Sequence, residues 1–129
     1  MCHCGITNVY AECCGRLIEG GQNPDSAESL MRSRYSAFVI KNMEYLQVTE
    51  DPQTRSFNNQ EDNRKFAESV EFTGLQVIFS SEKGNKATVE FIANYRDLIT
   101  GEVQMHHEVS QFRQQAGVWL YRQGRMLKS

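Results

Sequence analysis

All four cysteines of the chain lie within its first fourteen residues, in the pattern Cys2-x-Cys4-x8-Cys13-Cys14. Cysteines at such short spacing are typical ligands of a tetrahedral metal ion. Two disulfides are a weaker interpretation, because adjacent cysteines form a strained bridge and the sequence suggests no secretory signal. Four free structural cysteines would need an apolar setting that this short segment does not supply. We therefore predict a metal site, which the bound ion itself would fold.

Zinc is the ion that we expect, and iron is the alternative, because a tetrahedral set of thiolates suits both. His3 stands between the first two cysteines and is a competing ligand, but its position between them favours a side chain that points away. Four protein ligands leave no open coordination position. We therefore expect a structural rather than a catalytic centre.

The composition of the whole chain is that of a globular protein. It has 129 residues, of which 40% are apolar. This length and this apolar fraction suffice for one domain with its own core. A net charge of -2 argues against nucleic acid as the main partner, since that needs a basic excess. We find no apolar run of membrane-spanning length and no signal peptide, so we expect a cytoplasmic protein.

The glycine-rich stretch 16–25, which also contains a proline, divides the chain into two parts. We expect a metal-binding knuckle over residues 1–15, a linker over 16–25 and a folded body over 26–129. The body should begin with a helix over 26–41, whose apolar residues recur with helical spacing and which Asp25 or Ser26 can cap.

Shorter elements follow this helix. We expect a second helix within 42–51, ended by Pro52, then a polar loop over 53–61 and a third helix over 62–69. Beyond this point polar and apolar residues alternate between turn-forming stretches, which predicts an antiparallel meander. The predicted class is α+β, with N-terminal helices packed on a curved four-stranded antiparallel sheet whose strands cover about 71–82, 86–97, 102–114 and 117–126.

Two groups of motifs resemble known families. The segment CHCGITNVYAECCG resembles the SEC-C motif, a metal-binding motif also found at the tail of the preprotein translocase ATPase. The segments ESLMRSRYSAFV, FTGLQV, VEFIANY, HEVSQF and GVWLYRQG resemble the YchJ-like family of small bacterial proteins, over nearly the whole chain. The resemblance implies the cystatin-like cone of the nuclear transport factor two superfamily and no established enzymatic activity. It assigns the metal to Cys2, Cys4, Cys13 and Cys14.

The sequence departs from the family pattern at a few positions. The family usually has proline where His3 stands and a Ser-Gly pair where Ile6 and Thr7 stand. It usually has tryptophan at the position of Phe72. These exchanges keep the four thiol ligands and alter the surface that a partner would contact.

The body is predicted to contain a buried arginine. Arg34 and Tyr35 share a helical face with apolar residues, so the guanidinium should lie near the core and need a carboxylate. In the strand HEVSQF, the side chains of His106, Glu108 and Ser110 point to one side. We predict that Glu108 faces the concave side of the sheet and pairs with Arg34. The pair is interpreted first as a lock between helix and sheet.

The same concave side is a candidate small-molecule site. Tyr95 and Asp97 are candidates for its mouth and Tyr121 for its wall. A histidine beside an acid can act as a general base, but at most one of His106 and His107 faces inward. No recognisable set of nucleophile, base and orienting group accompanies them. We therefore favour a protein without catalytic activity.

Basic residues gather toward the C-terminus. Arg122, Arg125 and Lys128 are close in sequence, and Arg113 can lie nearby. A solvated strand end is one interpretation, and a local patch for ribosomal RNA or an acidic protein surface is the other.

Together these features favour a non-enzymatic, metal-binding adaptor that contacts a protein or a ribosome-associated partner. The alternative is a small-molecule-binding protein or enzyme that uses the concave pocket of the cone. A third interpretation is a dimer formed through the open face of the sheet.

Overall fold

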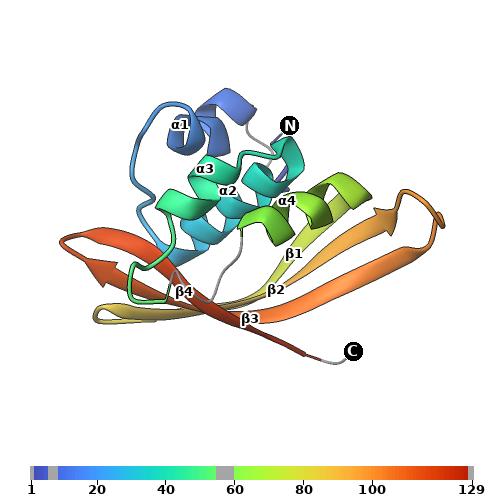
Figure 1. The fold of residues 1–129 in the computed structure, drawn as a ribbon. Helices are drawn as coiled ribbons and strands as arrows, with labels where there is room; N and C mark the ends of the chain where they lie inside the picture. Colours follow the sequence, from blue (N-terminus) through green and yellow to red (C-terminus); the bar gives the residue numbers. More distant parts are fainter. Residues whose placement is uncertain (1, 6–8, 55–59, 128–129) are drawn as a thin grey trace.

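The computed structural model describes residues 2–5, 9–54 and 60–127 (Figure 1). A single 3-10 turn and a short helix come first, three further helices follow, and four strands complete the chain. The bounds are η1 Tyr10–Glu12, α1 Cys14–Ile18, α2 Ala27–Ile40, α3 Met43–Val48, α4 Gln60–Ser69, β1 Val70–Lys83, β2 Lys86–Asp97, β3 Val103–Gln115 and β4 Val118–Met126. Within this described part of the chain, no helix is long and apolar enough to cross a membrane.

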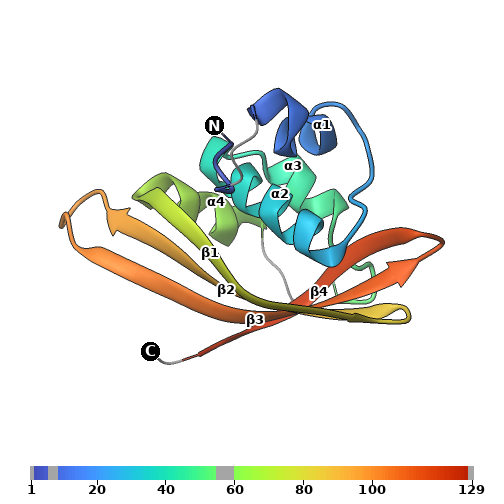
Figure 2. The ribbon, with the colours of Figure 1, turned by 180° about the vertical axis from the view of Figure 1, so that it is seen from behind.

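The four strands form one antiparallel sheet in the order β1-β2-β3-β4. Both views show the helices on one side of the curved sheet, and no helix in the described ranges covers the other side (Figures 1 and 2). The register places Phe91 of β2 opposite Glu108 of β3. The predicted α+β class, with helices first and a four-stranded meander after them, is confirmed.

The longest helix, α2, has well-defined ends. At its start the Ser26 hydroxyl accepts a hydrogen bond from the backbone N–H of Ser29 at 3.0 Å. At its end Lys41 takes a left-handed conformation with φ 62°, and its N–H donates to carbonyls of the last turn. The helix predicted over 26–41 is therefore confirmed to within one residue at each end.

The main core lies between α2 and the concave face of the sheet. Leu30 of α2, Val89 of β2 and Phe112 of β3 are fully buried there. Such burial supplies the main favourable free energy of folding, and it fixes α2 on the sheet. A second cluster joins α2 to the other helices through Ala37, Met43, Tyr45, Leu46 and Ala67.

The second predicted helix ends earlier than expected, before Pro52. After α3 the chain runs beside β4, where Glu50 forms a parallel bridge with Tyr121. The Asp51 N–H donates to the Tyr121 carbonyl, and the Tyr121 N–H donates to the Thr49 carbonyl, both at 2.8 Å. Because an edge strand needs partners for its backbone groups, this pairing ends the helix before the proline does.

Two other boundaries differ from the sequence expectation. α4 begins at Gln60 rather than at 62, because the Gln60 side-chain amide donates to Glu50 at 2.8 Å and anchors the first turn. Residues 55–59 of the predicted polar loop lie outside the described residues. α1 extends over the first three residues of the expected linker, where Leu17 is buried.

Candidate metal centre

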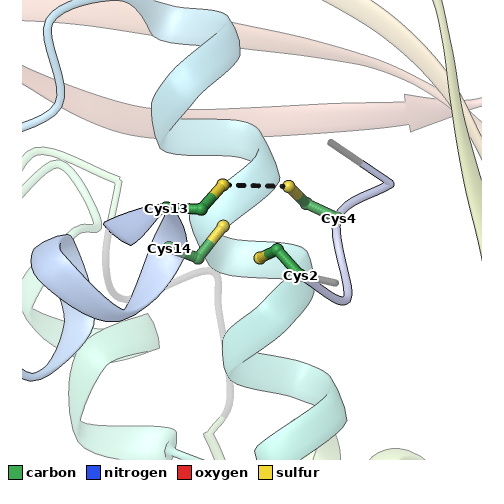
Figure 3. Close-up of side chains that lie close together, drawn as sticks. All are labelled: Cys2, Cys4, Cys13 and Cys14. Carbon is green, nitrogen blue, oxygen red and sulfur yellow. Dashed lines mark hydrogen bonds between the residues drawn. The ribbon is translucent and has the colours of Figure 1, made fainter. Parts of the chain in front are cut away.

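The four cysteine sulfurs converge on one point. All four Sγ atoms lie within 4.8 Å of one another, and those of Cys4 and Cys13 are 3.6 Å apart (Figure 3). A tetrahedral ion with metal–sulfur bonds of about 2.3 Å holds its sulfurs about 3.8 Å apart. The spacing of the four thiols therefore fits such an ion.

Two short backbone features present the thiols. The Gly5 N–H donates to the Cys2 carbonyl at 3.2 Å, and Gly5 takes φ 91°, a conformation that favours glycine. On the other side, the Cys13 N–H donates to the Tyr10 carbonyl at 3.0 Å, and α1 begins at Cys14. A loop and a helix start thus face each other across the site.

The cluster rests on the body of the protein. The hydroxyl of Ser36, on α2, lies 3.7 Å from the Cys2 sulfur, and Arg32 Nη1 donates to the Cys4 carbonyl at 2.7 Å. Leu75 of β1 packs against the cysteines. The site is therefore docked onto α2 and β1 rather than separated from them.

The electrostatics of the thiols favour a bound cation. Burial raises the pKa of Cys13 to about 11. The pKa of Cys14 is raised by its hydrogen bond with Cys4 and by burial. Four thiolates this close in a buried site repel one another, and a cation between them removes that penalty. The donor set suits zinc or iron, both of which accept four thiolates.

His3, the competing ligand, lies outside this group of sulfurs. Its side chain is exposed, and its ring makes an edge contact with Tyr10 at 5.7 Å between centroids. The cluster therefore consists of the four cysteines alone among the described residues.

Most of the predicted pocket residues line a single cavity of about 260 Å³ on the concave face. Tyr95 does not: its ring packs against Phe66 and Phe72, and its hydroxyl donates to Gln104 at 3.2 Å. Asp97 accepts backbone hydrogen bonds in the turn after β2 and also lies away from the cavity. The predicted residues in the lining are Arg34, Tyr35, His106, Glu108, Ser110 and Tyr121.

The predicted ion pair between Arg34 and Glu108 is wrong. Arg34 is buried and does have a carboxylate partner, but this is Glu50, whose Oε1 lies 3.8 Å from Nη2. Arg34 Nη1 donates to the Leu46 carbonyl at 2.8 Å and to the Thr49 hydroxyl at 2.6 Å. The guanidinium thus donates hydrogen bonds to the C-terminal end of α3. The alternation of side chains along a strand could not predict this contact, because α3 is not part of the sheet.

The two adjacent histidines face opposite sides of the sheet, as alternation predicts. His106 Nε2 lies 2.7 Å from Glu108 Oε1 and faces the cavity. His107 Nε2 lies 2.7 Å from Glu90 Oε2 and is not among the cavity residues. Each histidine therefore has its own carboxylate partner.

The C-terminal basic cluster is partly neutralised. Arg113 forms two hydrogen bonds of 2.8 Å with the buried Asp51, and Arg122 lies 3.3 Å from the same carboxylate. Arg125 is exposed, and Lys128 lies outside the described residues. Asp51, to which no local pattern in the sequence points, therefore pairs with two of the four basic side chains.

Sequence comparisons find a matching family and similar proteins over most of the chain. Residues 26–124 match the family described as the YchJ middle NTF2-like domain. A UPF0225 protein from Geobacter sulfurreducens is 36% identical, over 99% of this chain and 80% of its own length. A UPF0225 protein from Bordetella pertussis is 42% identical, over 95% of this chain and 90% of its own length.

Solved structures share the fold. The solution structure of a SEC-C motif containing protein from Rhodopseudomonas palustris is 42% identical, with a TM-score of 0.90 over 98% of both chains. A crystal structure of another from Psychrobacter arcticus is 27% identical, with a TM-score of 0.80 over 100% of this chain and 84% of that one. Fold and site define an NTF2-like domain preceded by a cysteine cluster that could bind a metal. The chain belongs to the YchJ-like family.

Proposed function

We propose that this chain is a binding module. Its N-terminal tip, the described part of residues 1–15, is fixed by a structural zinc ion. The tip serves as an adaptor for a protein partner, free or ribosome-associated. The observation that carries the proposal is the closed set of four sulfur ligands, which leaves the ion no position for a substrate. Iron in the same site is the alternative, and elemental analysis separates the two. Four reduced thiols agree with a cytoplasmic location.

The ion, when bound, supplies a crosslink between the first loop and the start of α1. The chain's own residues hold that crosslink in place, because Arg32 fixes the Cys4 carbonyl and Ser36 contacts Cys2. Such supporting contacts orient ligands and tune metal affinity. The tip is therefore held against α2 and β1, with α1 at the top of the helical layer in Figure 1.

The tip offers a surface for a partner. Val9 is 60% exposed beside the site, and His3 is exposed on the loop that carries two of the ligands. A protein is favoured over RNA as the partner, because the net charge is -2 and Asp51 neutralises part of the C-terminal basic cluster.

Affinity capture from a bacterial lysate tests the proposal with matched variants. Val9→Asp alters the tip without changing a ligand. Ile99→Asp makes the same kind of exchange in the turn after β2, where the side chain is 91% exposed. We expect a specific protein to be captured by the wild type and Ile99→Asp and lost with Val9→Asp and Cys13→Ser. Equal capture by Val9→Asp, with its metal content unchanged, contradicts the adaptor role.

A further inference from the structure

The cavity on the concave face has walls that suit a flat apolar group. It lies between α2, α4 and the sheet, and its volume of about 260 Å³ is slightly below the range of drug-sized sites. A ligand of this size is a small metabolite with a single ring or a short chain. The aromatic lining residues are Tyr35, Phe38, Phe66, Phe72, Phe91, Phe112 and Tyr121.

The carboxylate of Glu108 lines the cavity and accepts several hydrogen bonds from its neighbours. His106 Nε2 lies 2.7 Å from its Oε1, while the hydroxyls of Ser110 and Tyr121 both donate to its Oε2. Because an ionised carboxylate only accepts hydrogen bonds, the Nε2–H of His106 donates to it. Burial alone would raise the pKa of Glu108, but these hydrogen bonds outweigh it and hold the pKa below its ordinary value.

The carboxylate of Glu108 can accept one further hydrogen bond from a ligand. Its two oxygens offer about four acceptor positions, and the protein donors fill three of them. The Glu108 side chain is 14% exposed and lines the cavity. A donor group on a ligand can therefore reach it without displacing its partners.

Arg34, the one arginine among the described lining residues, bonds to other partners. Its Nη1 donates to the Leu46 carbonyl and the Thr49 hydroxyl, and its Nη2 faces Glu50. The guanidinium carbon lies 4.3 Å from the centroid of the Tyr121 ring, and the hydroxyl of the same tyrosine donates to Glu108. An anionic ligand would find this cation already occupied.

The charges of the lining favour a positive ligand. The described lining residues include three carboxylates, Glu50, Asp62 and Glu108, against the single permanent cation Arg34. His106 offsets one of these charges only when it is protonated. Aromatic faces add to this preference, because their negative electrostatic potential attracts cations and repels anions.

We propose that this cavity binds a small organic cation, an amine carried on an aromatic or apolar body, with the ammonium group on Glu108 and the body among the aromatic walls. This site is independent of the metal-centred function proposed above. The binding of such a ligand does not require a vacant position on the metal, since the cysteine cluster and the cavity lining share no residue.

Three probes of similar size and shape test the charge preference on the intact protein. Phenethylamine, 2-phenylethanol and phenylacetate share a ring and a two-carbon chain and are positive, neutral and negative at neutral pH. We expect phenethylamine to bind at least about tenfold more tightly than phenylacetate, the ratio that one charge-assisted hydrogen bond supplies. NMR titration at millimolar probe should shift the methyl signal of Ala93, which lines the cavity, more than that of Ile92 on the opposite face.

A pair of matched variants tests the role of Glu108. Glu108→Gln removes the charge inside the cavity, and Glu90→Gln removes the charge of the equivalent carboxylate–histidine pair on the other face. We expect Glu108→Gln to abolish the preference for phenethylamine and Glu90→Gln to retain it. If Glu108→Gln does not fold, the probe series on the wild type decides alone. Equal or stronger binding of phenylacetate, or no shift of the Ala93 methyl with any probe, overturns the proposal.

Discussion

Arg32 of α2 donates a hydrogen bond from Nη1 to the backbone carbonyl of Cys4 at 2.7 Å, while its Nε binds Glu28 one turn earlier at 3.0 Å. The Glu28 contact holds the arginine side chain in position across the helix surface. One turn further along, Ser36 contacts Cys2. The same helix lines the aromatic cavity with Arg34. α2 is therefore the common support of the cysteine cluster and the cavity.

Loss of the Arg32 contact should weaken metal binding without unfolding the protein. Arg32→Ala removes a charge-assisted hydrogen bond that orients the loop of Cys2 and Cys4, and supporting contacts of this kind are worth about 10–100-fold in metal affinity. Competition with a chromophoric chelator measures the change. Arg64→Ala, which removes an exposed arginine from α4, is the control and should leave the affinity unchanged. Equal affinities for wild type and Arg32→Ala would show that the contact does not support the site.

Asp51 should make the fold sensitive to acid. Its hydrogen bonds with Arg113 hold the pKa of Asp51 below its ordinary value, although burial opposes this. Its contribution to stability is therefore complete above the unfolded pKa of about 3.9 and is lost as the pH falls through the lower folded pKa. We expect Asp51→Asn to be less stable than the wild type by about 2 kcal/mol near pH 7, below the 3–5 kcal/mol of a fully buried pair because both arginines are partly exposed.

Denaturant unfolding at a series of pH values checks this expectation. The stability difference between wild type and Asp51→Asn should shrink from pH 5 toward pH 2. Glu71→Gln breaks an exposed pair with Arg96, and such pairs are worth about 0–1 kcal/mol, so it should change little at any pH. A difference between wild type and Asp51→Asn that stays constant across this range would contradict the assignment.

Gly124 should be required for the position of the cavity's carboxylate. A Cβ at this residue would overlap the side chain of Glu108, and overpacking of this kind costs about 1–3 kcal/mol. Gly74→Ala is the control in β1, because a Cβ there would come no nearer than 3.8 Å to Asn94. Thermal denaturation should show a loss for Gly124→Ala and almost none for Gly74→Ala.

Coupling between the two residues provides a sharper check. Glu108→Ala creates room beside Gly124, so it should cost less in the Gly124→Ala background than in the wild type. Additive effects of the two substitutions would show that the close approach does not determine stability.

Local patterns in the sequence were sufficient for the elements and for the cysteine cluster. The spacing of the cysteines, the capped start of α2 and the alternation in the strands each depend on a few neighbouring residues. Alternation also placed His106, Glu108 and Ser110 on one face, where they line the cavity.

Contacts between segments far apart in the sequence could not be predicted from such local patterns. The partner of Arg34 is Glu50, which lies after α3 in a segment whose path depends on its pairing with β4. The support from Arg32 and Ser36 also left no signal, because a polar residue on a helix can equally face solvent. The sequence predicts Tyr95 at the cavity mouth, whereas in the structure its ring packs against Phe72.

The central claim is that a metal ion organises the N-terminal tip, and elemental analysis of protein isolated without added metal tests it most directly. The account predicts a single zinc ion per chain, together with a loss of order around Cys2 and Cys14, seen in backbone NMR signals, when a strong chelator removes it. Natively isolated protein that contains no thiolate-bound metal, and whose tip signals are unchanged by the chelator, would contradict the account.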